Sequence, residues 1–258
     1  MRISNKTFST PWLACRTPNP RATLRLFCFP YAGGGASIFH SWTNRLPGFI
    51  EVCPVQLPGR GGRFAEPPCT QFQTLVPALV NGLFPYFDRP FAFFGHSMGA
   101  ILAFEVARQL RREFRVQPAR LFVSGCRAPQ IPDREPPIYN LSEPKLLEEL
   151  RRLNGTPREL LEDPDSMQFM LPLLRADFEL IETYAYTPEP SLDVPIRAFS
   201  GLQDAEITRA DVEGWREQTT AAFSLSMLSG DHFFLQTAQS TLLQLLAHRL
   251  SQRIDEAV

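Results

Sequence analysis

The sequence carries the stretch FAFFGHSMGA at residues 91–100, and this stretch decides what the rest of the chain can be. An apolar run typical of a buried strand leads directly into a G-x-S-x-G pattern, and helical sequence follows as far as Phe114. A strand, a sharp turn and a helix in this order indicate a nucleophile elbow, which exposes a serine above a sheet. The tight turn brings backbone close on both sides, so side chains at Gly95 and Gly99 would collide. Ser97 is therefore the candidate nucleophile.

Length and composition favour one globular domain. The chain has 258 residues, of which 44% are hydrophobic and 21% charged, and no linker-like stretch interrupts residues 1–258. The formal net charge of -1 gives no electrostatic footprint for nucleic acid. No run approaches the roughly 18 apolar residues of a membrane span, and the N-terminus has no apolar leader segment. We therefore expect no nucleic-acid partner and no membrane association.

The cysteines indicate a reducing compartment. There are five of them, an odd number, and Cys28, Cys53 and Cys126 fall in or beside strand-like segments, where a free thiol packs as a small hydrophobic group. A disulfide framework is not expected from this pattern. Together with the absence of a leader segment, it predicts a cytoplasmic protein.

Short apolar runs alternate with longer helical patterns, which predicts an α/β fold with a mostly parallel central sheet and helices on both faces. The predicted strands are Leu24–Phe29, Glu51–Val55, Phe91–Phe94, Arg120–Ser124, Ile196–Ser200 and Phe223–Leu228. The predicted helices are Ser37–Leu46, Thr70–Phe87, Met98–Phe114, Thr208–Gln218 and Thr237–Gln252.

One block, at about residues 133–187, breaks this alternation. It contains no good strand, but apolar residues recur at helical spacing over Leu146–Leu153 and again over Met170–Ile181. Proline-rich joints at Pro129–Pro137 and Pro188–Pro195 bound it. An insertion at this point of an α/β chain lies over the carboxyl ends of the strands, where the site must be. We interpret the block as a helical lid, with plain packing as the alternative for any single residue.

A serine hydroxyl is a poor nucleophile at neutral pH, so Ser97 needs a general base, and that base needs an orienting acid. Of the four histidines, His232 alone stands in a loop directly after a predicted strand, from which it can reach the serine. His96 precedes the nucleophile and should point away from it, while His40 and His248 fall in predicted helices. His232 is therefore the candidate base, with an inconsequential loop histidine as the alternative.

The acid should lie between Ser97 and His232 in chain order, at the end of another strand. Asp204 fits best, because it follows the predicted strand Ile196–Ser200 and a glycine turn. Capping of a helix that begins near Thr208 is the structural alternative for this aspartate. The weaker candidates are Asp231, whose position next to the histidine forces the two side chains apart, Glu206 and Asp193.

Attack on a carbonyl group also needs backbone N–H donors around the developing negative charge, and one such donor contributes about 3 kcal/mol. The N–H of Met98 is the first expected donor, and the second should come from the loop Phe29–Gly35. A glycine-rich loop also suggests phosphate binding, but neither G-K-[ST] nor G-x-G-x-x-G occurs here. Because no metal-ligand spacing such as C-x-x-C or H-E-x-x-H occurs either, no metal or bound cofactor is expected.

Taken in order, several segments of this chain resemble the type II thioesterases that accompany nonribosomal peptide and polyketide synthases, a branch of the α/β-hydrolase fold. The resemblance implies that Ser97, Asp204 and His232 form a catalytic triad. It also implies that the N–H groups of Ala32 and Met98 form the oxyanion hole. The matching segments are Phe29–Gly34, Leu57–Arg60, Gly95–Gly99, Leu171–Phe178, Gly201–Asp204 and Gly230–Phe234.

By this resemblance, the chain hydrolyses acyl thioesters from the 4′-phosphopantetheine arm of carrier protein domains and so clears stalled or misprimed acyl groups from a synthase. It contains no G-x-D-S-type attachment site, so the acyl or peptidyl carrier must be supplied in trans. No cofactor is implied beyond the arm that carries the substrate, and a monomer is expected. For Arg60 and Arg63, on the loop Leu57–Arg63, a structural salt bridge is the favoured interpretation, and contact with the phosphate of the arm is the alternative.

Two other functions remain open at this point. A medium-chain acyl-carrier or acyl-CoA thioesterase, or a general carboxylesterase, would use the same three residues, because one triad opens thioesters and oxyesters alike. A catalytically silent hydrolase-fold binding protein is the alternative outside enzymes. Such proteins usually lose a triad member, whereas this chain retains a candidate for each.

Overall fold

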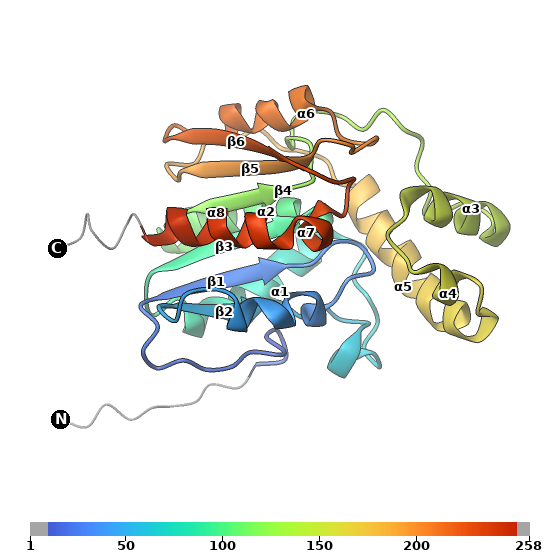
Figure 1. Cartoon of the computed structure of the whole chain (residues 1–258), viewed down its shortest axis with the longest axis horizontal. Coiled ribbons are helices and arrows are strands. Elements are labelled where there is room, and N and C mark those ends of the chain that lie inside the picture. Colours follow the sequence, from blue (N-terminus) through green and yellow to red (C-terminus); the bar gives the residue numbers. More distant parts are fainter. Residues whose placement is uncertain (1–9, 252–258) are drawn as a thin grey trace.

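The computed structural model describes residues 10–251, which form a six-stranded sheet with helices on both faces (Figure 1). Within this range all neighbouring strands pair in parallel, in the order β2-β1-β3-β4-β5-β6. The predicted parallel α/β sheet is confirmed, and each predicted strand is present. The strands are β1 (Leu24–Phe29), β2 (Ile50–Pro54), β3 (Phe91–His96), β4 (Leu121–Ser124), β5 (Ile196–Gly201) and β6 (Phe223–Leu228).

The two faces of the sheet bury separate apolar clusters. Strand residues alternate between them, so that Phe27 and Phe29 join one cluster while Leu26 and Cys28 join the other. Helices α1, α2 and α6 cover the first face, and η1 and α8 cover the second (Figure 1). Burial on both faces is what produces the continuous apolar runs of the sequence. These elements are η1 (Ala36–Asn44), α1 (Phe72–Leu83), α2 (Met98–Gln109), α6 (Arg209–Glu213) and α8 (Gln239–Ser251).

The predicted helical segments keep nearly their predicted extents, but several of them change helix type along their length. The first long one stops at Leu83 and continues as the 3-10 turn η3 (Phe84–Tyr86), where Pro85 lacks the amide hydrogen that an α-helix needs. The one after the nucleophile widens into a π turn, η4 (Leu110–Phe114), and ends where Arg115 adopts a φ of 56°. The remaining short elements are η2 (Gly61–Arg63), η5 (Gly214–Gln218), which continues α6, and α7 (Phe234–Thr237).

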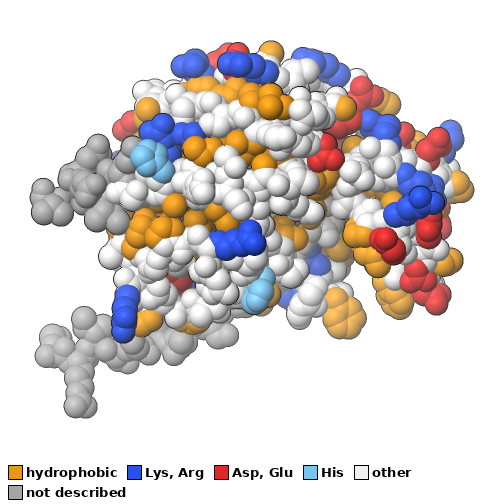
Figure 2. All heavy atoms as spheres, viewed as in Figure 1, with side chains coloured by type: hydrophobic (Ala, Val, Ile, Leu, Met, Phe, Trp, Pro, Cys, Tyr) orange, Lys and Arg blue, Asp and Glu red, His pale blue; other side chains and the backbone are white. Residues whose placement is uncertain are grey.

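Three helices lie between β4 and β5 in the chain and beside the carboxyl ends of the strands in space (Figure 1). These inserted helices are α3 (Glu143–Leu153), α4 (Arg158–Leu161) and α5 (Pro164–Glu182). They bury an apolar cluster of their own, separate from the two clusters of the sheet. On the face seen in Figure 2, positive and negative side chains are interspersed over them. The cluster consists of Leu146, Leu150, Leu161, Met167, Leu171 and Leu174.

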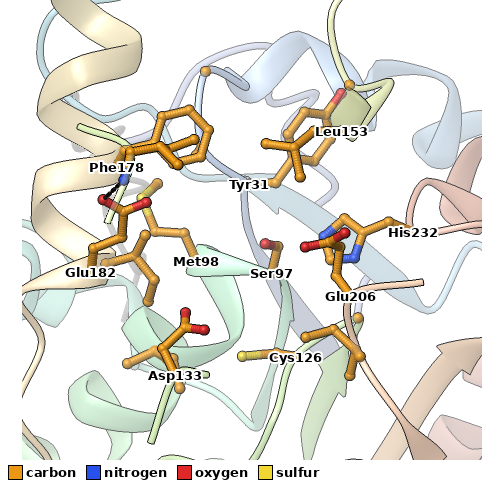
Figure 3. A pocket seen from close by; sticks show the side chains of 18 of the residues that line it. Tyr31, Ser97, Met98, Cys126, Asp133, Leu153, Phe178, Glu182, Glu206 and His232 are labelled. Carbon is orange, nitrogen blue, oxygen red and sulfur yellow. Dashed lines mark hydrogen bonds between the residues drawn. The ribbon is translucent and has the colours of Figure 1, made fainter. Parts of the chain in front are cut away.

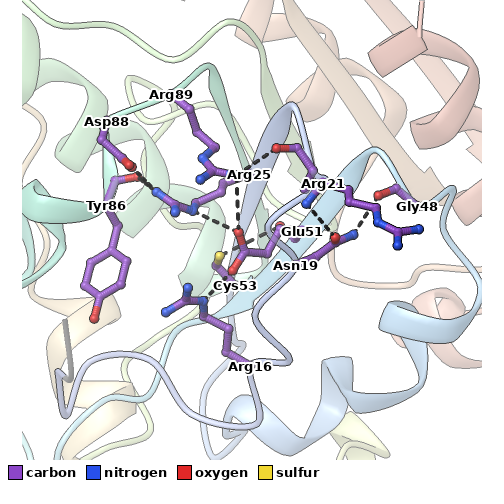
Figure 4. A network of polar contacts seen from close by, with 11 residues as sticks. Arg16, Asn19, Arg21, Arg25, Gly48, Glu51, Cys53, Tyr86, Asp88 and Arg89 are labelled. Atoms are coloured by element: carbon purple, nitrogen blue, oxygen red, sulfur yellow. Dashed lines mark hydrogen bonds and ion pairs between the residues drawn. The ribbon is translucent and has the colours of Figure 1, made fainter. Parts of the chain in front are cut away.

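A buried polar network lies at the amino ends of β1 and β2, at the other end of the strands from the inserted helices (Figure 4). The carboxylate of Glu51 accepts hydrogen bonds from Nε of Arg16 at 2.5 Å and from Nε of Arg25 at 3.1 Å. Arg25 also donates to the Tyr86 carbonyl at 2.7 Å and pairs with Asp88. Because Arg25 and Glu51 are register partners, this network stabilises the β1–β2 pairing and the turn that leads into β3.

Within the described residues, no helix is long and apolar enough to cross a membrane. The cysteines at positions 15, 28, 53, 69 and 126 are all free, as the sequence predicts. Two expectations extend beyond the described residues. These are the absence of a leader segment over residues 1–9 and the end of the last helix at Gln252.

Candidate active site

Ser97 occupies the turn between β3 and α2, in the middle of the sheet. Its backbone angles, φ 53° and ψ -123°, are rarely adopted by residues other than glycine and cost about 1–3 kcal/mol. Two backbone hydrogen bonds of 2.8 Å hold this conformation, one from Ser97 N–H to the Ser124 carbonyl and one from Ala100 N–H to the Ser97 carbonyl. The sharp strand-to-helix turn predicted from the G-x-S-x-G pattern is therefore present.

The glycines on either side of Ser97 have the steric role expected of them. A Cβ atom on Gly95 would lie 2.0 Å from the Gly99 carbonyl oxygen, and one on Gly99 would lie 2.2 Å from the Phe29 carbonyl oxygen. Real Cβ atoms do not approach other atoms so closely. Both oxygens belong to the backbone, so neither can move aside as the end of a flexible side chain could. The elbow can therefore form only with glycine at both positions.

Replacing Gly99 with alanine is expected to lower the free energy of unfolding by more than about 3 kcal/mol, because the added methyl group would push α2 away from β1. Urea denaturation followed by circular dichroism measures this. Gly48→Ala is the matched control, since a Cβ there would meet no atom within 4 Å. Equal stability of the two variants would contradict the close packing of the elbow.

The loops after β5 and β6 bring an acid and an imidazole together. Nδ1 of His232 lies 2.9 Å from Oδ2 of Asp204, whose side chain is fully buried. The other oxygen of Asp204 accepts the backbone N–H groups of Glu206 at 3.0 Å and Ile207 at 3.1 Å. These two bonds fix the carboxylate, so the histidine ring is held by its Nδ1 side and its Nε2 remains available.

The other carboxylates considered from the sequence are engaged elsewhere. Asp231 accepts from Asn154 Nδ2 at 3.1 Å and from the Phe233 N–H at 2.9 Å. Glu206 pairs with Arg152 at 2.5 Å, and Asp193 is exposed to solvent. Among these four carboxylates, Asp204 is the one that bonds to His232.

Ser97 and His232 line one pocket of about 1000 Å³. Figure 3 shows both side chains facing its interior, with Leu153 and Phe178 of the inserted helices across from the elbow. Most of the wall is apolar, which suits a hydrophobic acyl chain. No hydrogen bond links Ser97 Oγ to the His232 ring among the described side chains; apo sites often make this contact only when substrate binds.

Two backbone amides at the base of this pocket have no acceptor in the described part of the chain. They are the N–H groups of Ala32, in the loop after β1, and of Met98, the first residue of α2. Both residues line the pocket with Ser97. An N–H at a helix start carries partial positive charge, so the two amides suit a negatively charged oxygen.

His96 has a separate place in the structure. Its ring is fully buried at the end of β3, its Nδ1 lies 2.9 Å from Ser124 Oγ, and it packs against Tyr31 and Phe234. Desolvation, and next the charge of His232, lower the pKa of His96 well below 6.5. It therefore stays neutral near pH 7 and, as expected, is not among the residues that line the pocket.

Cys126, in the loop after β4, is a second potential nucleophile in the pocket that the sequence did not single out. Burial raises the pKa of its thiol to about 12. Since a thiol is protonated below its pKa, only about one molecule in 10⁴ carries the reactive thiolate at pH 8. Cys126 is therefore a wall of the pocket rather than a reacting group.

We expect iodoacetamide at pH 7.5 to alkylate the exposed Cys15 and to leave Cys126 unmodified, with no loss of activity. Labelling of Cys126 should increase only at strongly alkaline pH, because burial raises the pKa of its thiol and the thiolate is the attacking form. Peptide mapping by mass spectrometry measures each site separately. Rapid labelling of Cys126 at neutral pH, with loss of turnover, would contradict this assignment.

The structure confirms the interpretation of the loop Leu57–Arg63 as a place of structural salt bridges. Both arginines there are engaged within the protein. Arg60 is buried and bonds to Asp177 at 2.6 and 2.7 Å, while Arg63 pairs with Glu66 at 2.6 Å. Neither guanidinium is available for the alternative phosphate contact without breaking its ion pair.

The comparisons with known proteins agree with this geometry. The thioesterase domain family matches residues 24–251. The linear gramicidin dehydrogenase LgrE of Brevibacillus parabrevis is 45% identical over 250 residues, which cover 95% of both chains. The RedJ thioesterase of prodiginine biosynthesis in Streptomyces coelicolor superimposes with a TM-score of 0.85 at 41% identity, over 90% of this chain and 92% of that one. The type II thioesterase BorB from the borrelidin cluster gives a TM-score of 0.84 at 33% identity, over 95% and 98%. The chain therefore belongs to the thioesterase family, with the α/β-hydrolase fold.

Proposed function

We propose that this thioesterase works through a triad of Ser97, His232 and Asp204. Nε2 of His232 takes the proton of the Ser97 hydroxyl as Oγ attacks the thioester carbonyl carbon. The tetrahedral intermediate then expels the thiolate, which receives the proton back from His232 and leaves as a thiol. A water molecule attacks the acyl-serine in the same way and releases the carboxylic acid. These steps need no metal or bound cofactor.

Asp204 has two tasks in this proposal. It keeps His232 in the tautomer with a proton on Nδ1, and it stabilises the imidazolium that forms during attack. The N–H groups of Ala32 and Met98 form an oxyanion hole and donate hydrogen bonds to the negatively charged oxygen of the tetrahedral intermediate. The observation that carries the proposal is the 2.9 Å hydrogen bond of the buried Asp204 with His232, which lines the same pocket as Ser97.

The proposed substrate is an acyl group on the 4′-phosphopantetheine arm of a carrier protein domain, supplied in trans by a nonribosomal peptide or polyketide synthase. The activity removes stalled or misprimed acyl groups. Two features support this: the relatedness to type II thioesterases and an apolar pocket large enough for an extended acyl chain. We further propose that the inserted helices act as a lid over this pocket, and that the protein acts as a cytoplasmic monomer.

The test compares three substrates with the same octanoyl group: octanoyl carrier protein, octanoyl-CoA and p-nitrophenyl octanoate. We expect the largest kcat/KM for the carrier protein, because contacts to the carrier add binding energy that the smaller substrates lack. Equal or faster turnover of the CoA ester or the phenyl ester would favour a medium-chain acyl thioesterase or a carboxylesterase. Binding of the acyl carrier without any turnover would favour a silent binding protein.

A further inference from the structure

A buried ion pair joins the inserted helices to the loop after β2. Arg60 donates to both carboxylate oxygens of Asp177 on α5, at 2.7 and 2.6 Å, and the two side chains are 6% and 1% exposed. An ion pair buried this deeply contributes little net stability, because desolvation offsets most of the attraction.

Other hydrogen bonds of this pair hold the glycine-rich loop after β1. Oδ2 of Asp177 accepts the Gly33 N–H at 2.7 Å, and Arg60 Nη1 donates to the Gly34 carbonyl at 2.9 Å. Gln56, which is also buried, accepts the Ala36 N–H at 3.0 Å and donates to the Arg60 carbonyl at 2.7 Å. Buried side chains thus fix the amide of Gly33 and the carbonyl of Gly34, two neighbouring residues of this loop.

Helix α5 also lies directly on the loop. Gly33 has a φ of 77°, and a Cβ added there would lie 2.6 Å from Cδ2 of Leu174, one turn before Asp177 on the same helix. The loop therefore has one ordered path between the sheet and α5. With the Gly33 amide bonded to Asp177, the neighbouring Ala32 amide is left without an acceptor and beside Ser97 in the pocket.

We propose that Arg60 and Asp177 are positioning residues that aim the Ala32 N–H at the oxygen of the tetrahedral intermediate. This rests on the function proposed above for Ser97 and the two amides. The pair links oxyanion stabilisation to α5, which also supplies Leu174 and Phe178 to the wall of the acyl pocket. The packing of α5 against the loop after β1 is then required for catalysis as well as for acyl binding.

The test uses Arg60→Lys and Asp177→Asn. Lysine keeps a positive charge beside Asp177 but cannot form the two-pronged contact or reach the Gly34 carbonyl with the same geometry. We expect kcat on the octanoyl carrier protein to fall about 10- to 100-fold in each variant, with KM changed less than about 3-fold. A displaced N–H donor stabilises the oxyanion less well, so the rate falls by part of the amount that deleting the donor would cost.

Two ligands separate positioning from general loosening. Octylboronic acid bonds through boron to Ser97 Oγ and places a negatively charged oxygen in the oxyanion hole. The S-octyl thioether of the carrier has no such oxygen and reports only on binding of the chain and the carrier. We expect the boronate affinity to fall by about the same factor as kcat/KM, and the thioether affinity to stay within about 3-fold of wild type.

Arg108→Lys is the matched control, since Arg108 is an equally buried arginine whose ion pairs with Glu105 and Glu189 do not involve the loop after β1. It should lose thermal stability without losing boronate affinity. All variants are compared at a temperature where circular dichroism shows them folded. Wild-type boronate affinity in Arg60→Lys and Asp177→Asn, or equal losses for both ligands, would overturn the positioning role. A wild-type protein that hydrolyses none of the acyl substrates would instead overturn the proposed function.

Discussion

Replacing Ser97 with alanine is expected to reduce hydrolysis of an acyl carrier protein by at least about 10⁴-fold. Without Oγ no acyl-enzyme can form, and the remaining oxyanion donors act only on direct attack by water. The fold should be unaffected, because the Ser97 side chain makes no hydrogen bond within the described residues and both backbone bonds of the elbow remain. Steady-state rates and mass detection of an acyl-enzyme, present in wild type and absent in the variant, measure the effect.

Ser37→Ala is the matched control for this experiment. Ser37 is the other serine among the residues that line the pocket, but it lies in η1 and not at the elbow. The variant should retain turnover and the acyl-enzyme. If Ser97→Ala kept wild-type turnover, the nucleophile would have to be another residue, and the mechanism proposed here would fail at its first step.

The second large effect is expected for Asp204→Asn, with kcat reduced by about 10³- to 10⁴-fold. An amide at this position can donate a hydrogen bond to Nδ1, which favours the tautomer whose Nε2 carries a proton and cannot act as a base. The two backbone amides on Oδ1 should keep the loop in place, so the unfolding temperature should change little. Rate measurements at saturating substrate test this.

Asp231→Asn provides the comparison, because Asp231 is adjacent to His232 in sequence but bonds to Asn154 and to the Phe233 amide. We expect turnover within about 3-fold of wild type. The reverse pattern, with Asp231→Asn inactive and Asp204→Asn active, would reassign the acid.

Much of the fold could be predicted because its signals are local. Strands β1 to β4 are buried along their whole length, so each gives a short apolar run in the sequence, and glycines mark the elbow. Asp204 and His232 could be placed because each follows a strand of a parallel sheet, whose carboxyl ends share one edge. The changes of helix type could not be predicted, because they depend on single turns such as the 3-10 turn at Pro85 and the π turn before Arg115.

The contact between Arg60 and Asp177 could not be predicted from the sequence. The two residues are 117 positions apart, and each stands in a segment with an ordinary local explanation, a loop arginine and a polar position on an amphipathic helix. Only the tertiary contact reveals that both reach the loop after β1. The same holds for Cys126, whose place in the pocket depends on how the loop after β4 turns.

The position of β6 has a consequence for heat inactivation. Within residues 10–251 this strand is at the edge of the sheet and pairs only with β5, and most of its residues are half-exposed. The loop that follows it supplies His232. Strands of this kind are the first to detach in partial opening, whereas β3 in the middle is the last. On warming, the catalytic activity should therefore be lost some degrees below the melting temperature. Cooling should restore the activity as long as the central strands have remained folded.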